Sequence, residues 1–331
     1  MIAFERISDA AGARRGLELA RTCIRVDHPG MVAGSLEEIM HQLSGVQRSS
    51  RYAHFLAVED GADVAHGTVR LPLRDNLAGA TVSLSVLPSR RRRGIGTALA
   101  REILAFVSGA GRTHVAWTVG SPVGKESPGR AFSRLLGARK VLSRLRRELD
   151  LRDVDDSKLD DLVNARIEGR DSDYDIVTWV DRAPDALVDG VANLVGRMST
   201  DTPRGDLSTD PEVRDASRWR GGGRCLPFWT ATPCGRRCRS QRPLGGFHGH
   251  RRLGSRASRR RAVEHDVDPD HRGHRLGLAI KVANLRNLRR EIPGALGLET
   301  WNTLENFRIV AINELLGFHI VESVDEYQLS L

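Results

Sequence analysis

The chain has 331 residues, 40% of them hydrophobic, and exceeds the roughly 100–200 residues of a single domain, so it can bury two cores. Its formal net charge is +9, but the stretch from Arg218 to Arg261 carries thirteen arginines and no acidic residue, which leaves the rest at −4. The charge is therefore local and does not by itself indicate a nucleic-acid partner. The chain has no apolar run long enough to span a membrane, no secretory signal and only four cysteines, so we expect a cytoplasmic protein without a membrane partner or a disulfide framework.

The first half alternates between strand-like and helical patterns. Apolar residues at every second position predict strands, and apolar residues three and four apart predict helices. In chain order we expect a strand over 2–7, helices over about 10–25 and 36–46, a hairpin of 54–58 with 64–71, a strand over 80–86, a helix over 97–108, a strand over 114–119, a helix over about 125–136 and a strand over 140–151.

The second half follows the same order less completely. After an acidic linker and a short helix, we expect a strand over 174–179, a helix over 183–198, strands over 296–299 and 318–329, and a helix over about 303–316. The sequence shows no apolar alternation for the hairpin that should lie between about 218 and 262. We expect domains over 1–152 and 173–331, joined by a linker over 153–172.

Two short patterns recur at nearly the same spacing. Residues 86–96 and 267–277 each begin as the Val-x-Pro end of a strand, continue through a basic turn with glycine and lead into a helical pattern, and Pro88 of the first corresponds to Pro269 of the second. A Leu-Leu-Gly sequence at 135–137 returns at 315–317, at almost the same offset. Two landmarks at nearly one offset indicate two copies of one domain.

The recurring turn has the chemistry of a phosphate site. Glycine lets successive backbone N–H groups converge, the following helix adds its positive end, and arginines suit phosphate oxygens. Neither a Walker pattern nor three-glycine dinucleotide spacing is present. The simpler alternative is a basic turn before a surface helix.

The turn resembles motif A of the GCN5-related N-acetyltransferases (GNAT), Arg/Gln-x-x-Gly-x-Gly/Ala after a Val-x-Pro strand end. The first copy matches with Arg91, Gly94 and Gly96, and the second has Arg275 in place of the first glycine. The context of the second copy is similar to tandem actinobacterial members. The resemblance implies an α/β protein with two tandem acyl-CoA N-acyltransferase folds, each a mixed, mostly antiparallel sheet flanked by helices.

The resemblance also implies an acetyl-CoA cofactor and its binding residues. In the first copy these are Leu84, Ser85 and Val86 for the pantetheine arm, and Arg91, Arg92, Arg93, Gly94, Ile95, Gly96 and Thr97 for the pyrophosphate. In the second copy they are Val267, Arg272, Gly273, His274, Arg275, Leu276, Gly277 and Leu278, with Asn302 and Asn306 lining the cofactor. Asn302 has an alternative role as a helix cap.

The segment 218–262 departs from the family pattern, which is normal on either side of it. We interpret it as out-of-frame translation of a GC-rich gene, which yields Arg, Gly, Pro, Cys and Trp without core periodicity. One alternative is a basic nucleic-acid-binding insertion. Another is a zinc site from Cys234, Cys238, His248 and His250, whose His-x-His spacing is tighter than in zinc fingers; we expect no metal.

Acid–base candidates differ between the copies. Many relatives use a tyrosine four residues before the Leu-Leu-Gly glycine to protonate the leaving thiolate, and here Ser133 and Asn313 hold that position. The strand before the first turn has no titratable group, whereas the second copy offers Glu264 and Asp266, of which either is a candidate base, directly or through water. Solvated charges at a strand end are the alternative for both.

These observations predict an N-acetyltransferase that moves an acetyl group from acetyl-CoA to the amine of a small molecule or peptide. The absent tyrosines favour an alternative, a catalytically inert coenzyme A-binding or scaffold protein. A third candidate is a nucleic-acid binder that uses the basic segment. The sequence does not identify the acceptor, because acceptor loops vary freely on a shared fold.

Overall fold

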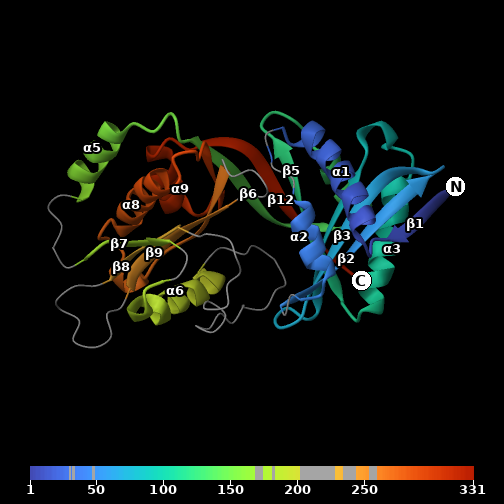
Figure 1. The fold of residues 1–331 in the computed structure, drawn as a ribbon, viewed down its shortest axis with the longest axis horizontal. Helices are drawn as coiled ribbons and strands as arrows, with labels where there is room; N and C mark the ends of the chain where they lie inside the picture. Colours follow the sequence, from blue (N-terminus) through green and yellow to red (C-terminus); the bar gives the residue numbers. More distant parts are fainter. Residues whose placement is uncertain are drawn as a thin grey trace. The chain divides into compact units, whose positions relative to one another are not determined.

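A computed structural model describes residues 1–29, 31, 34–46, 49–167, 174–180, 183–201, 228–233, 244–252 and 259–331. The chain forms two compact units (Figure 1), and the division falls inside a strand, between Arg144 and Leu145. The last ten residues, Glu322–Leu331, belong to the first unit. The predicted division at residues 152 and 173 follows the sequence repeats and stays a prediction. None of the helices in the described ranges has the length and apolar character of a membrane span.

The first unit is a mixed, mostly antiparallel sheet with helices on both faces. Its sheet runs in the order β1-β2-β3-β4-β5-β12, with the start of β6 beyond β12. Its elements are β1 (Ile2–Arg6), α1 (Ala10–Asp27), α2 (Leu36–Leu43), β2 (Ser50–Glu59), β3 (Ala62–Pro72), β4 (Gly79–Val86), α3 (Ile95–Gly109), β5 (His114–Pro122), α4 (Pro128–Leu135), β6 (Arg139–Asp150, to Arg144) and β12 (His319–Ser330, from Glu322).

Local sequence explains where the helices of the first unit begin. The carboxylate of Asp9 accepts a hydrogen bond from the backbone N–H of Gly12 at 2.8 Å, and Ser35 caps α2 in the same way. Ser127 caps α4 and Pro128 follows as its first residue, so this helix begins three residues later than the periodicity predicts.

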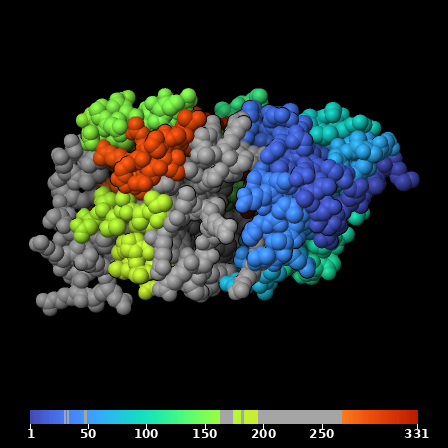
Figure 2. All heavy atoms as spheres, viewed as in Figure 1, coloured from blue at the N-terminus to red at the C-terminus, as the bar shows by residue number. Residues whose placement is uncertain are grey.

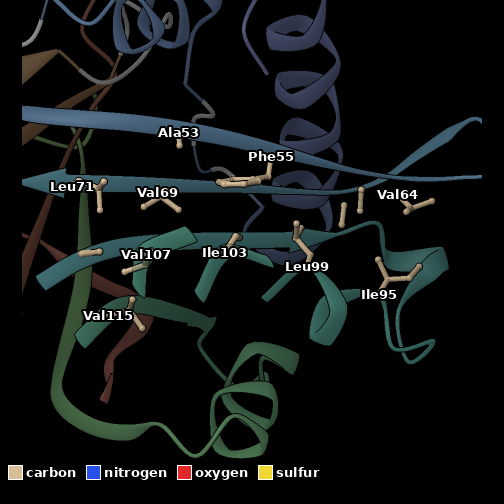
Figure 3. Packing of buried hydrophobic residues seen from close by; sticks show 13 residues of the cluster. Ala53, Phe55, Val64, Val69, Leu71, Ile95, Leu99, Ile103, Val107 and Val115 are labelled. Atoms are coloured by element: carbon tan, nitrogen blue, oxygen red, sulfur yellow. The ribbon is translucent and has the colours of Figure 1, made fainter. Parts of the chain in front are cut away.

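The core of the first unit lies between α3 and the sheet. Figure 3 shows Leu99, Ile103 and Val107 of α3 against side chains of β2, β3 and β5, among them Phe55 and Val69. Full burial of a side chain such as Leu99 contributes about 2 kcal/mol. α3 approaches β3 so closely that a methyl group on Gly67 would collide with Ile103, which explains a glycine within a strand.

The second unit has the same sheet type and the order β6-β11-β10-β9-β8-β7. α5 lies along α8, as the green and orange spheres of Figure 2 show, and Arg286 and Arg289 of α8 pair with acidic residues of α5. Its elements are the end of β6, α5 (Asp156–Ile167), β7 (Val177–Val180), α6 (Val188–Asp201), β8 (Phe228–Pro233), β9 (Leu244–Arg252), β10 (Arg259–Val267), α8 (Leu276–Glu291), β11 (Gly297–Thr303), α9 (Phe307–Leu315) and the start of β12.

The segment 218–262 contains a hairpin, although its sequence shows no apolar alternation. β8 pairs antiparallel with β9, with Phe228 opposite His250 and Ala231 opposite Phe247, and β9 pairs with β10. β8 begins with Phe-Trp-Thr, which are strong strand formers, so a strand forms without strict alternation. The out-of-frame interpretation concerns the gene and stays a prediction; Cys234 and Cys238 lie outside the described residues.

Candidate active site

In both units the strand before the basic turn separates from its neighbour. β4 pairs with β5 in parallel only over Gly79–Thr81, and in the second unit β10 pairs with β11 only over Arg259–Arg261. Beyond Thr81, β4 has no further residue paired with β5 in the described chain, and beyond Arg261, β10 has none paired with β11. β4 stays paired with β3 along its other edge. Each unit therefore has an open strand edge to which an extended ligand can hydrogen-bond like an added strand.

The two basic turns have the same backbone conformation. In each, a short 3₁₀ turn follows the strand, and two residues then adopt left-handed φ angles: Arg92 (62°) and Gly94 (81°) in the first unit, Gly273 (86°) and Arg275 (57°) in the second. Glycine and arginine thus exchange places between the copies. Arg275, which departs from the motif, takes the conformation of the glycine that it replaces.

The turns present helix N-termini without a side-chain cap. α3 begins after Gly94 and α8 after Arg275, and neither residue makes a capping hydrogen bond. The first backbone N–H groups of an α-helix have no partner within it and carry partial positive charge. Each open strand edge therefore leads to a site that suits phosphate, which is the arrangement that a ligand with a pyrophosphate and an extended arm requires.

Comparisons with known proteins agree with this geometry. Residues 25–127 match the acetyltransferase (GNAT) family. The chain is 30% identical to the mycothiol acetyltransferase of Salinispora arenicola over 286 residues, which cover 84% of this chain and 82% of that protein. The chain belongs to the GNAT family of acetyltransferases.

Solved structures show the same tandem fold. A tandem GNAT protein from the clavulanic acid biosynthesis pathway matches with a TM-score of 0.77 and 23% identity, over 100% of this chain and 98% of that one. A GCN5-related N-acetyltransferase from Sphaerobacter thermophilus matches with a TM-score of 0.65 and 16% identity, over 99% and 95%. The predicted family and fold class are confirmed.

Arg91 is engaged within the protein. Its Nε donates to the carbonyl of Val86 at 3.0 Å, and its two terminal nitrogens donate to the carboxylate of Asp27 at 2.8 and 2.6 Å. The hydrogen bonds to Asp27 raise the pKa of Arg91. Arg91 thus connects the end of α1 to the turn, whereas Arg92 is exposed. Arg272 repeats the Nε contact, with the carbonyl of Val267 at 3.0 Å.

The other predicted cofactor residues of the first unit lie along one path. Leu84, Ser85 and Val86 are half-buried on the open part of β4, and Arg93, next to the turn, pairs with Glu59 at 3.5 Å. The carbonyl of Val86 also accepts a hydrogen bond from the Cys23 thiol at 3.4 Å, so it has partners within the protein. The last residues of the path are in the first turn of α3: Ile95, Gly96 and Thr97.

The positions where relatives carry a tyrosine are buried and occupied in both units. Ser133 accepts a hydrogen bond from the indole N–H of Trp117 and donates one to the carbonyl of Gly129, both at 2.8 Å. Asn313 accepts a hydrogen bond from Lys281 and donates one to Asn302 at 2.7 Å. Asn302 therefore bonds to Asn313, and Asn306 occupies the cap position of α9 without a capping hydrogen bond.

Lys281 is a buried cation that sequence reasoning missed. Burial lowers its pKa from 10.5 to about 7, and the ring of Phe318 lies 5.8 Å from its Nζ. No carboxylate pairs with it in the described part of the chain. The signal in the sequence was a lysine between Leu278 and Leu285 on the apolar face of α8.

For the predicted bases of the second unit, the structure describes the backbone but not the side chains. Glu264 and Asp266 lie on β10 opposite Gly249 and Phe247, but their side chains are outside what the structure describes. Their proposed role stays a prediction. Among the described side chains, no three His, Cys, Asp or Glu gather as a metal site would require.

Two carboxylates in the first unit come from the last strand of the chain. β12 pairs antiparallel with β5 and places Glu322 opposite Pro122 and Glu326 opposite Thr118. Glu326 accepts a hydrogen bond from Arg144 at 2.9 Å, and burial raises its pKa. The sequence repeats assign β12 to the second domain, so sequence reasoning did not consider these groups for the first.

Proposed function

We propose that the protein transfers an acetyl group from acetyl-CoA to the amine of a polar acceptor. The observation that carries this proposal is the open edge of β4 leading into the uncapped N-terminus of α3, repeated at β10 and α8. Such a site suits the pantetheine arm on the strand and the pyrophosphate at the helix. Fixing the thioester in this way brings its carbonyl within reach of an amine, which is most of what acyl transfer needs.

The name of the related mycothiol acetyltransferase makes a mycothiol-type amine the first acceptor to test. The β4 side chains that point away from α3 agree with a polar acceptor. Thr81 and Ser83 are exposed there and offer hydroxyl groups beside the separated strands. Hydroxyl groups can both donate and accept hydrogen bonds, which suits an acceptor rich in polar groups.

Calorimetric titration with acetyl-CoA tests the donor site. Arg92→Glu with Gly94→Asp places negative charge at the first turn and should abolish one binding site. Arg101→Glu reverses an exposed charge on α3 outside the turn and is the matched control, with unchanged stoichiometry. Absence of binding to the folded wild type would overturn the proposal.

A thiol-release assay with a panel of small polar amines then tests transfer. Binding of acetyl-CoA without acetylation of any amine would favour the second candidate, an inert coenzyme A-binding protein. The observation that favours this candidate is the occupation of both tyrosine positions: Ser133 and Asn313 are fully buried and bonded within the protein.

A further inference from the structure

A histidine and a glutamate from opposite ends of the chain meet in the first unit. His28 follows α1 and Glu322 lies on β12, 294 residues later, yet His28 Nδ1 and a Glu322 carboxylate oxygen are 2.5 Å apart. The Glu322 side chain is 3% exposed and that of His28 is 22% exposed. The carboxylate is therefore buried behind an imidazole that solvent still reaches.

The pair lies against the part of β5 that has separated from β4. A methyl group on Gly120 would collide with the Glu322 carboxylate and lie 2.9 Å from the His28 ring, so only glycine leaves room for the pair. The pairing of β4 with β5 ends at Ala116, four residues before Gly120. The imidazole therefore lies beside the opening between the two strands.

The pair and the phosphate turn lie on opposite faces of the sheet. On β5, Trp117 bonds to Ser133 of α4, and Val119 contacts Gly129 of the same helix. Gly120 points the other way, because side chains alternate along a strand. The first turn of α3 lies on the α4 side, since a methyl group on Gly96 would be 3.6 Å from Phe132. A donor held at that turn and an acceptor beside His28 would meet through the opening.

We propose that His28 is the general base of the first unit and that Glu322 positions it; this rests on the proposed acetyl transfer. With Nδ1–H donating to Glu322, the lone pair of Nε2 is free to take a proton. The amine nitrogen attacks the thioester carbon as Nε2 accepts the amine proton. The C–S bond then breaks, and the proton passes through solvent to the departing thiolate, so the products are the amide and coenzyme A.

Two other carboxylates among the described residues of this region are paired with arginines. Asp27 pairs with Arg91, and Glu326 pairs with Arg144 on the same face of the sheet. His66 of β3 is buried beneath α1, and burial lowers its pKa to about 4, so it is neutral near pH 7. Glu322 is therefore the carboxylate that directly controls the His28 proton.

Kinetics of His28→Gln and Glu322→Gln test the roles. With the amine that the wild type acetylates best among a mycothiol-type amine, ethanolamine, spermidine, glucosamine and an alanine dipeptide, His28→Gln should lower kcat by about 100-fold or more and remove the acidic limb of its pH profile. Glu322→Gln should lower kcat by about 10-fold or more with little change in the KM for acetyl-CoA. His41→Gln and Glu102→Gln, which change exposed side chains elsewhere, should match the wild type.

Chemical modification tests the pair without any acceptor. Diethyl pyrocarbonate acylates neutral imidazole, and peptide mass spectrometry follows the reaction of His28 and of the exposed His41 separately. Glu322→Gln should lower the His28 rate several-fold and leave the His41 rate unchanged. Equal His28 rates in the wild type and Glu322→Gln would overturn the pairing.

The outcomes separate the two proposals. If the wild type acetylates an amine and both variants retain its kcat and pH profile, His28 is not the base, although the proposed function stands. If the folded wild type binds no acetyl-CoA or acetylates none of the amines, the acetyltransferase proposal fails, and the assignment of His28 as its base fails with it. Thermal unfolding of each variant confirms that it is folded.

Discussion

Two buried histidines make the first unit sensitive to acid. His54 and His66, on neighbouring strands β2 and β3, stack with ring centroids 5.7 Å apart. Gln42 accepts a hydrogen bond from His54 Nε2 at 2.9 Å, and Thr68 donates to its Nδ1 at 3.3 Å, so both nitrogens are satisfied in the neutral form. His66 Nε2 is buried under Gly16 of α1 and has no hydrogen-bond partner among the described residues.

Burial lowers the pKa of both histidines from 6.5 to about 4, and for His66 the neighbouring His54 adds to the effect. The unfolded chain therefore binds protons below pH 6.5 that the folded chain does not yet bind. The stability of the folded state is complete above pH 6.5 and is lost as the pH falls toward 4. For each histidine, linkage gives a loss of about 2 kcal/mol at pH 5 and about 3 kcal/mol at pH 4.

His66→Leu removes one titrating group at similar volume. Its free energy of unfolding should fall less between pH 7.5 and pH 5 than that of the wild type, by about 2 kcal/mol. Urea unfolding at each pH, followed by pulsed hydrogen exchange of β2 and β3 peptides, measures this in the first unit. His41→Leu removes an exposed histidine of α2 and is the control. Equal pH dependence in the wild type and His66→Leu would refute the reasoning.

The remaining predictions concern backbone strain, packing, a buried charge and the gene. Arg92→Gly and Arg275→Gly relieve left-handed φ angles and should each raise the free energy of unfolding by up to about 1 kcal/mol in urea titrations. Gly120→Ala should destabilise the first unit by about 1–3 kcal/mol, because the new methyl group overlaps the histidine–glutamate pair; differential scanning calorimetry measures this. Burial lowers the pKa of Lys281 to about 7, so the free energy of unfolding of the wild type should rise from pH 7 to 10.5. Lys281→Met should remove this rise and should stabilise the protein at pH 7 by about 1–4 kcal/mol. Urea midpoints at pH 7 and 10 measure both effects. Translation of the other two frames across 218–262 should yield two strands with apolar alternation.

A specific result would contradict each of these predictions. A loss of stability in Arg92→Gly or Arg275→Gly would mean that the arginine side chain contributes more than the strain costs. An unchanged unfolding temperature in Gly120→Ala would mean that β5 has room for a methyl group beside the histidine–glutamate pair. A flat pH dependence of the wild type between 7 and 10.5 would mean that Lys281 stays charged. Two frames without strand patterns would favour an inserted basic segment.

Much of the fold could be predicted because its signals are local. The Val-x-Pro strand ends, the turns and the apolar stripes of α3 and α8 lie within a few residues, where spacing and propensity determine structure. The repetition of the turn and of the Leu-Leu-Gly sequence at nearly one offset predicted two related halves. The exchange of glycine and arginine between the left-handed positions escaped prediction, since the order of residues does not show φ angles.

The candidate site was predictable on one face only. The phosphate turns are continuous in sequence, so their residues could be named in advance. The face across the sheet is built from α1, β5 and β12, and the pairing of β5 with a strand from the far end of the chain joins them. Alternation marks a strand but does not name its partner, and so Glu322 was considered only with the second half.

The element order of the first half and the two turns thus followed from residues near one another in the chain. Tertiary structure alone decided that His28 meets Glu322, that Lys281 is buried beside Asn313, and that Arg91 binds Asp27. These contacts depend on which strand fills which place in a sheet and how closely helices approach it. Long-range pairing and packing determine both, and neither leaves a local pattern in the sequence.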